Sequence, residues 1–256
     1  MGKLRQWQGR LLRDALALER AYHALNTGSD DPEALHTLRV AIRGLRARLA
    51  PFAGNVAVDQ IRSELGALAH DTNALRDDEV MRELLATLPG GPALLMRLPA
   101  SPATHSLAET LALHRTGVDG LHRRVRNAVT AFTRSTVADA GRRRTRKARR
   151  KLQASLAALT PSHPAIEWHA ARLRVKKARY LHEGQALWLG RRWRDFGSHC
   201  KPAQEALGRM HDLDVLWLRY GASFTPELRD AWQAARQQAM ISADAAVWRL
   251  LRALGK

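Results

Sequence analysis

Apolar side chains recur at helical spacing along almost the whole chain. Within residues 35–49, leucine or isoleucine occurs at positions 35, 38, 42, 45 and 49, which is the spacing of one face of a helix. Runs of β-branched residues with strict apolar and polar alternation, which indicate strands, are absent from the sequence. Helix-breaking stretches occur at 27–30, 51–55, 89–102, 135–141, 160–161, 190 and 221–226. The pattern predicts an all-α protein of about eight helices.

Two polar motifs each occur twice, in the same order. In the first, a histidine is followed at three, seven and ten residues by Arg or Lys. Its two copies, 133 residues apart, are His36, Arg39, Arg43 and Arg46, and His169, Arg172, Lys176 and Arg179. The second motif contains Asp77 in one copy and Asp212 in the other, at an offset of 135 residues. Two motifs at nearly one offset indicate an internal duplication. We therefore predict two repeats, 1–134 and 135–256, that together form one domain over 1–256.

On a helix, the cations of each copy lie beside an apolar stripe. At about 100° per residue, the four polar residues of 36–46 fall within an arc of about 80°. The apolar residues of 35–49 form a second arc, centred about 90° away. In the second copy the apolar arc consists of Trp168, Ala171, Val175 and Ala178, while His182 replaces Leu49. Because the apolar stripe docks the helix, we expect the cations along the wall of a groove beside the packing seam.

The charge balance favours a polyanionic partner. Forty-two Lys and Arg face 24 Asp and Glu, which gives a net charge of +18. The excess is concentrated in the second predicted repeat, with a net charge of +14 against +4 in the first. Such a field attracts nucleic acid, anionic lipid or polyphosphate without choosing between them.

A helix face that carries only cations differs from an ordinary solvated face, which usually mixes both signs. Like charges three and four residues apart repel by about a few tenths of a kcal/mol per pair. An anionic ligand would offset this repulsion, and the guanidinium fork of Arg matches phosphate oxygens. A solvated face remains the alternative for any one such helix, but the repetition of the pattern favours a binding role.

The compartment is predicted to be the cytoplasm. The first residues lack the uninterrupted apolar stretch of a signal peptide, and no run of about 18 uncharged apolar residues occurs, so no membrane association is expected. Cys200 is the single cysteine, so no intrachain disulfide can form and a reducing compartment fits.

Residues 35–46 and 169–180 resemble the two signatures of CHAD domains, the conserved histidine α-helical domain family. Residues 74–77 and the pattern Lys201-x-x-Gln204-x-x-Leu207-Gly208 resemble the helix that follows each signature. The sequence departs from the family pattern in two places. Thr72-Asn73 stands where the family usually has Leu-Gly, and His211 stands where Asn is usual. The chain lacks the Glu-x-Glu-x-Lys signature of the triphosphate-tunnel domain that some members carry, so a stand-alone member is expected.

The resemblance implies two four-helix bundles related by a pseudo-twofold axis, with inorganic polyphosphate as the ligand. Carried onto this sequence, the polyphosphate-binding candidates are His36, Arg39, Arg43, Arg46, His169, Arg172, Lys176, Arg179 and Lys201. We expect a non-catalytic binding module that docks on polyphosphate granules. No cofactor is expected, and no metal, because a cation beside the arginines would be repelled.

Two other functions fit part of the sequence. A basic helical protein can bind nucleic acid non-specifically, which is the main alternative. His36, the His70-Asp71 dyad and Asp119 resemble the spacing of metal-dependent phosphohydrolases of the HD type. In the duplication, however, His211-Asp212 aligns with Arg76-Asp77 and not with that dyad, which indicates that the dyads are accidental.

The remaining features have structural interpretations. The basic tract 142–151 is predicted to be helical, because an apolar stripe continues through it at 148, 152, 156 and 159. Most of the seven tryptophans occupy apolar helical positions and are expected in the core or in helix seams. Asp77, Asp212 and Asp214 are expected to cap or pair with basic helices.

Overall fold

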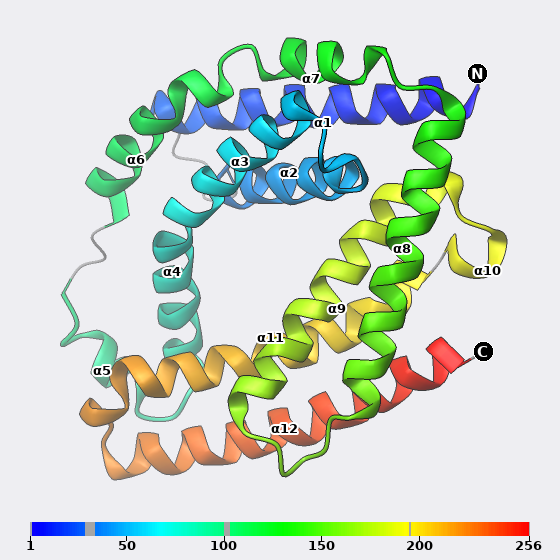
Figure 1. The fold of residues 1–256 in the computed structure, drawn as a ribbon. Helices are drawn as coiled ribbons and strands as arrows, with labels where there is room; N and C mark the ends of the chain where they lie inside the picture. The colour runs from blue at the N-terminus through cyan, green and yellow to red at the C-terminus, as the bar shows by residue number, and fades with distance from the viewer. Residues whose placement is uncertain (1, 29–33, 100–102, 195, 256) are drawn as a thin grey trace. The chain divides into compact units, whose positions relative to one another are not determined.

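The computed structural model describes residues 2–28, 34–99, 103–194 and 196–255, apart from the side chains of 74–76, 103–106, 192 and 194. Every regular element within these ranges is helical (Figure 1), which confirms the all-α prediction. Parts of two predicted breakers, 29–30 and 100–102, lie outside the described residues, as do the side chains of the Ala74-Leu75-Arg76 segment. None of the described helices is long and apolar enough to cross a membrane.

The longer helices are α1 (Lys3–Asn26), α2 (Ala34–Leu49), α3 (Val56–Asp71), α4 (Asn73–Ala86), α6 (Ala103–Val118), α7 (Leu121–Thr130), α8 (Arg134–Ala157), α9 (Ala165–Gln185), α11 (Phe196–Tyr220) and α12 (Pro226–Gly255). Short helical segments are η1 (Ala50–Phe52), α5 (Gly91–Leu95), η2 (Ala186–Trp188), α10 (Arg191–Arg194) and η3 (Gly221–Ser223).

Three helix boundaries differ from the sequence prediction. Thr72 ends α3, where its hydroxyl donates a hydrogen bond to the Leu68 carbonyl oxygen over 2.8 Å. Gly120 separates α6 from α7 with a φ of 68°, a left-handed conformation that glycine adopts without strain. The breaker predicted at 135–141 is wrong, because the Thr133 hydroxyl accepts a hydrogen bond from the Thr136 backbone N–H and begins α8 there.

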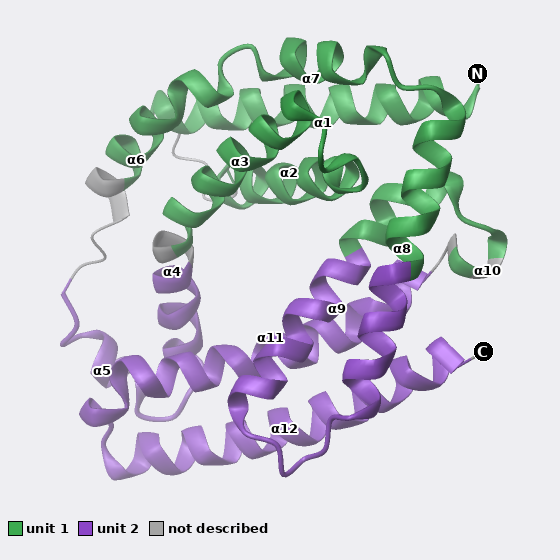
Figure 2. Cartoon of the chain, viewed as in Figure 1, with its two compact units in different colours: residues 1–75, 102–146, 180–194 green, residues 76–101, 147–179, 195–256 purple. Residues whose placement is uncertain are grey.

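The described chain divides into two compact units (Figure 2). Unit 1 contains residues 1–75, 102–146 and 180–194, and unit 2 contains residues 76–101, 147–179 and 195–256. Three of the boundaries between the units fall inside helices, in α4, α8 and α9. These units are defined by contacts, whereas the repeats 1–134 and 135–256 are defined by sequence motifs, so the duplication stays a prediction.

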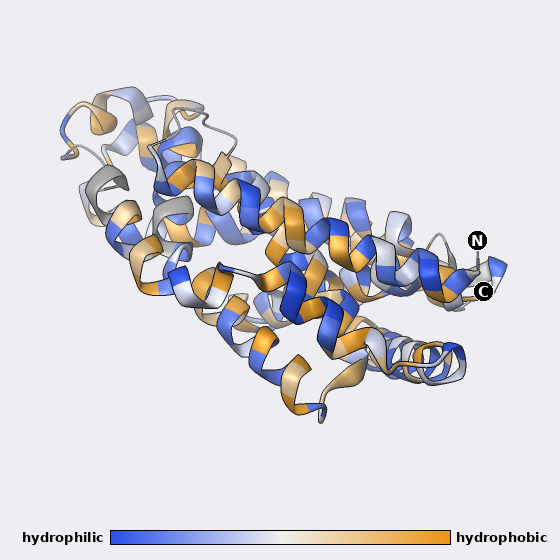
Figure 3. Cartoon of the chain, turned by 90° about the horizontal axis from the view of Figure 1, so that it is seen from above, coloured by the Kyte–Doolittle hydropathy of each residue, from blue (hydrophilic) through white to orange (hydrophobic). Residues whose placement is uncertain are grey.

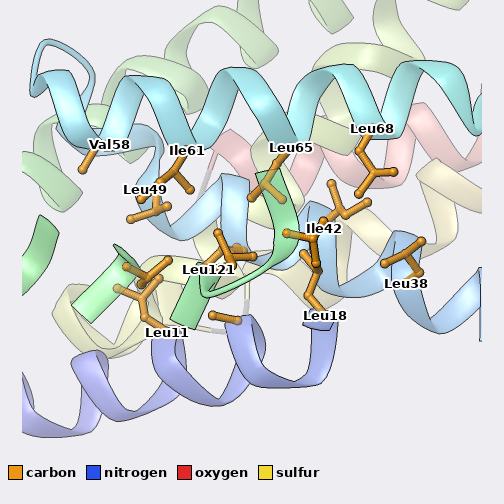
Figure 4. Packing of buried hydrophobic residues seen from close by; sticks show 14 of the residues in the cluster. Leu11, Leu18, Leu38, Ile42, Leu49, Val58, Ile61, Leu65, Leu68 and Leu121 are labelled. Carbon is orange, nitrogen blue, oxygen red and sulfur yellow. The ribbon is translucent and has the colours of Figure 1, made fainter. Parts of the chain in front are cut away.

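The core of unit 1 forms where α1 and α3 both pack against α2 and α7. The apolar arc of α2 lies in this core, as predicted, with Leu38, Ile42, Leu45 and Leu49 fully buried. Figure 4 shows Leu38, Ile42 and Leu49 among apolar side chains of α1 and α3. Burial of this stripe fixes the rotation of α2 about its axis, and therefore fixes where its cations lie.

The core of unit 2 contains the apolar arc of α9 and the seam between α11 and α12. Trp168, Ala171, Val175 and Ala178 are buried as predicted. Figure 3 shows that the helices carry both hydrophobic and hydrophilic residues, as expected for helices that bury one face.

The tryptophans fit the predicted core and seam positions in most cases. Trp7, Trp168 and Trp188 are buried. Trp217 of α11 and Trp232 of α12 stack with their ring centroids 4.5 Å apart. Trp248 differs, because it is 62% exposed.

Candidate anion-binding site

The polar motif of α2 lies beside the buried stripe of that helix. We call His36, Arg39, Arg43 and Arg46 the α2 cation row. His36 is exposed, and the three arginines are half-buried. Half-burial lets the arginine stems pack on protein while the guanidinium groups approach the surface.

Arg39 binds the carboxyl end of α3. Its Nη1 donates to the Thr72 carbonyl oxygen over 2.9 Å and lies 3.3 Å from the Thr72 hydroxyl, and its Nη2 donates to Asn73 Oδ1 over 2.8 Å. A cation is favoured there by the unpaired carbonyls and the negative end of the helix dipole. These three acceptors are neutral, so they orient the guanidinium without cancelling its charge. Thr72 and Asn73 therefore position a candidate ligand-binding residue.

Arg43 stacks on an aromatic ring. Its Cζ lies 5.7 Å from the centroid of the Tyr180 ring, and its Nε is buried without a hydrogen-bond acceptor among the described residues. Cation–π contact restricts the guanidinium while leaving its net charge intact. Arg43 and Arg46 make no ion pair with a carboxylate in the part of the chain that the structure describes.

Arg46 lies across α3 at Gly66. A Cβ atom at Gly66 would be 3.2 Å from Arg46 Nη2, so the missing side chain makes room for the guanidinium. Burial, and then the neighbouring Arg62 guanidinium, lowers the pKa of the Arg46 side chain. Two guanidinium groups from adjacent helices therefore lie close together, and an anion between or beside them would be stabilised by both charges.

Arg62 is a candidate that the sequence motifs missed. It pairs with Asp59 at 3.3 Å through Nη1, while its Nε is buried without a hydrogen-bond acceptor among the described residues. The sequence contains one signal that points to it, since Arg62 and Gly66 are four residues apart and share a face of α3. That face opposes α2, with which α3 packs.

Unit 2 carries the second motif on α9. We call His169, Arg172, Lys176 and Arg179 the α9 cation row. All four are half-buried beside the buried apolar arc of that helix. The Nε of Arg172 lies 4.0 Å from where a Cβ at Gly208 of α11 would be, so the guanidinium passes over this glycine. Arg172 makes no hydrogen bond or ion pair within the described residues, whereas Lys176 and Arg179 have further interactions.

The remaining candidate of unit 2, Lys201, is exposed on α11 and lies 3.8 Å from Glu205, one turn away on the same helix. An exposed pair of this kind contributes little stability. The Glu205 carboxylate thus offsets part of the Lys201 charge.

His169 contacts a second histidine that the sequence did not assign to the site. The Nδ1 atoms of His169 and His211 are 3.1 Å apart, and their ring centroids are 4.3 Å apart. Burial and then Arg172 lower the pKa of His169. Burial, Arg172, His169 and Lys176, in that order, lower the pKa of His211 to about 4. Both imidazoles are therefore neutral near pH 7 without a ligand.

The basic tract 142–151 is helical, as predicted, and lies within α8. Apart from the buried Thr145, its residues are exposed or half-buried. Arg142 pairs with Asp139 over 2.7 Å, so part of its charge is compensated locally. The tract adds positive potential along α8.

Two acidic side chains of unit 2 pair with arginines. Asp214 of α11 pairs with Arg236 of α12 at 2.9 Å, as predicted. A buried acid that the sequence analysis missed, Asp78, lies 2.8 Å from Arg82 and 3.3 Å from Arg219. Asp77 is exposed on α4.

The residues of the phosphohydrolase alternative are not assembled into one centre. Asp71 pairs with His114 at 2.8 Å, and Asp119 lies 3.4 Å from His23. Among the described residues, no three His, Cys, Asp or Glu side chains are close enough together to hold a metal ion.

Comparison with known proteins identifies the family. The family model described as CHAD domain matches residues 10–221. No curated protein matches the chain. Two solved structures share the fold. The CHAD domain from the plant Ricinus communis has a TM-score of 0.65 at 20% identity, with 97% of this chain and 92% of that one covered. PptA from Streptomyces chartreusis has a TM-score of 0.59 at 18% identity, with 99% of both chains covered. The chain therefore belongs to the CHAD domain family.

Proposed function

We propose that this protein binds inorganic polyphosphate without catalysing a reaction, and that the binding docks it on polyphosphate granules. The α2 cation row of unit 1 and the α9 cation row of unit 2 would each supply contacts to the polymer. The observation that carries the proposal is the set of half-buried arginines Arg43, Arg46 and Arg172. None of them has a carboxylate partner within the described residues.

Polyphosphate suits such a surface because it is a linear polyanion without bases. Recognition then depends on a track of positive charge with hydrogen-bond donors, and not on the reading of base edges. Arginine side chains supply paired donors, and a net charge of +18 favours encounter with any polyanion. Binding that depends on such contacts weakens steeply with salt, as phosphate-contacting proteins do when counterions are released.

The arginines of the α2 row are held in place before a ligand arrives. Arg39 is hydrogen-bonded to the end of α3, Arg43 stacks on Tyr180, and Arg46 lies against Gly66. A side chain that is already positioned loses less conformational entropy on binding, which raises affinity. An ordinary solvated face has no need of such positioning, so these contacts favour a binding role.

The proposal is tested by neutralising each row and comparing charge-matched controls. The row variants are Arg43→Gln with Arg46→Gln, and Arg172→Gln with Lys176→Gln. The controls remove two exposed cations elsewhere in the same unit, Arg5→Gln with Arg20→Gln, and Arg249→Gln with Arg252→Gln. Each charged hydrogen bond contributes about 1.5–3 kcal/mol, so we expect each row variant to lose at least about tenfold in polyphosphate affinity. Equal losses in row variants and controls would contradict specific rows and leave only general charge.

Chain length tests whether both rows act on one polymer. A polyphosphate long enough to reach both rows should bind more tightly than a short one, because the second contact is intramolecular. That advantage should shrink when either row is neutralised. An unchanged advantage in both variants would contradict binding of one polymer by both rows.

The nucleic-acid alternative is tested by competition at moderate salt. We expect DNA or RNA at equal phosphate concentration to displace bound polyphosphate poorly. Efficient displacement would favour a nucleic-acid-binding protein. Incubation of polyphosphate with the protein and a divalent metal should release no orthophosphate, and release above a no-protein control would contradict the non-catalytic assignment.

A further inference from the structure

The contact between His169 and His211 has a defined hydrogen-bonding requirement. A neutral imidazole has one N–H and one lone pair on its two ring nitrogens. At 3.1 Å, one Nδ1 must donate and the other must accept. The donor ring therefore has its lone pair on Nε2, where it can take up a proton. The resulting imidazolium would keep its Nδ1–H bonded to the second ring, and that bond would become charge-assisted.

The charges around this pair oppose protonation in the free protein. The cations that act on His211 are those of α9, namely Arg172 and Lys176, together with His169 itself. On α11 the nearest acids in sequence are Asp212 and Asp214, and Asp214 is engaged with Arg236 of α12. Neither imidazole contacts a carboxylate among the described residues. The neighbouring cations thus disfavour protonation of both imidazoles.

A bound anion would reverse this balance. Phosphate oxygens beside Arg172 and Lys176 would stabilise an imidazolium at the same place, both by opposite charge and by accepting a ring N–H. Neither histidine is protonated in the free protein near neutral pH, so the extra proton would arrive with the ligand.

We propose that His169 and His211 form one proton-accepting part of the phosphate site in unit 2, so that polyphosphate binds together with a proton. The proposal rests on the proposed function and names His211 as a further binding residue. One proton from solvent adds to the free Nε2 of the donor ring, and the charge it brings pairs with a phosphate oxygen.

Linkage gives the sign of the effect. A site that takes up a proton on binding gains affinity as the pH falls, between the pKa of the bound state and that of the free state. One proton corresponds to up to about a tenfold change in affinity per pH unit in that window. Loss of the imidazole at 211 should remove this part of the pH dependence and leave the arginine contacts.

The experiment measures the dissociation constant of long-chain inorganic polyphosphate from about pH 8 to about pH 5 at constant salt. Proton uptake is measured in parallel by calorimetry in buffers of different ionisation enthalpy. The proteins are the wild type, His211→Gln, His169→Gln and the control His163→Gln. His163 bonds to Thr160 in the α8–α9 loop, outside the row. A long polymer is used because its few terminal phosphates contribute little titration.

We expect the wild type and His163→Gln to bind more tightly at low pH and to take up more protons than His211→Gln and His169→Gln. Parallel pH profiles and equal proton uptake in all four proteins would overturn the inference, while polyphosphate binding itself would still stand. Failure of the wild type to bind polyphosphate at any pH would overturn the proposed function and the inference together.

Discussion

Arg46 of α2 lies against Gly66 of α3. A methyl group at position 66 would be 3.2 Å from Arg46 Nη2. The glycine is inside a helix, where it destabilises by about 0.5–1 kcal/mol relative to alanine. The room that Gly66 leaves for the Arg46 guanidinium explains why a glycine occupies this helical position. The relationship couples the packing of α2 on α3 to the position of a candidate ligand-binding residue.

Gly66→Ala should therefore separate stability from binding. We expect the free energy of unfolding to stay the same or rise by up to about 1 kcal/mol, because alanine favours the helix. Polyphosphate affinity should fall about two- to fivefold, because the guanidinium must shift. Gly9→Ala in α1 is the matched control, since its new methyl would meet only Arg13 at an ordinary 3.6 Å. Denaturant unfolding and a binding titration give both quantities, and an unchanged affinity in Gly66→Ala would contradict the role of Arg46.

Arg62→Gln tests the residue that the sequence motifs missed. Removal of this cation should weaken polyphosphate binding about three- to tenfold, because one charge-assisted contact to the ligand is lost. The control is Arg126→Gln, which removes an exposed cation from α7 of the same unit. A titration at fixed salt compares the two. If both variants lose the same small amount of affinity, Arg62 contributes only to the general field.

Arg39→Ala should affect folding as well as binding, unlike the other members of its row. Its bonds to Thr72 and Asn73 at the end of α3 are lost, and we expect a decrease of about 1–2 kcal/mol in the free energy of unfolding. Arg43 makes a cation–π contact with Tyr180, so Arg43→Ala should lower the free energy of unfolding by less than about 1 kcal/mol. Urea denaturation ranks the two variants, and the reverse order would contradict the capping role of Arg39.

The stability of the ligand-free protein should depend on pH through His211. Its folded-state pKa of about 4 lies below the ordinary value of 6.5, so the unfolded chain binds more protons between these values. Stability should thus fall as the pH drops from about 6.5 to about 4. Allowing for screening by solvent, we expect this contribution to be about 1–2 kcal/mol. His211→Gln should show a flatter profile in denaturant unfolding across this range, and an equally steep profile would contradict the assignment.

The rows themselves follow from the sequence, because they depend on local periodicity. Residues three and four apart share a helix face, so the buried stripe of 35–49 and the neighbouring cations could be placed without tertiary information. The helix ends were less predictable. Thr133 and Thr136 form a cap in a stretch that reads as a breaker, because the same polar side chains begin helices and interrupt them.

The partners of the cations could not be predicted, because they come from residues distant in sequence. Arg39 finds its acceptors at Thr72 and Asn73, and Arg43 finds the Tyr180 ring. The ion pair between Asp78 and Arg219 could not be predicted for the same reason, because the two residues are distant in sequence. Side-chain patterns specify the face that a residue occupies, and they do not specify which residue of another helix faces it.

By itself, the sequence determined the helical class, the buried stripes and the two rows of cations, because each depends on a repeat of three to four residues along one helix. Only the tertiary structure decided that Arg46 crosses Gly66 beside Arg62, and that His169 meets His211. Those contacts depend on how α2 packs on α3 and how α9 approaches α11. The rotation of each helix about its axis follows from burial of its own stripe, but the register between two helices is set by side-chain interlocking across the interface.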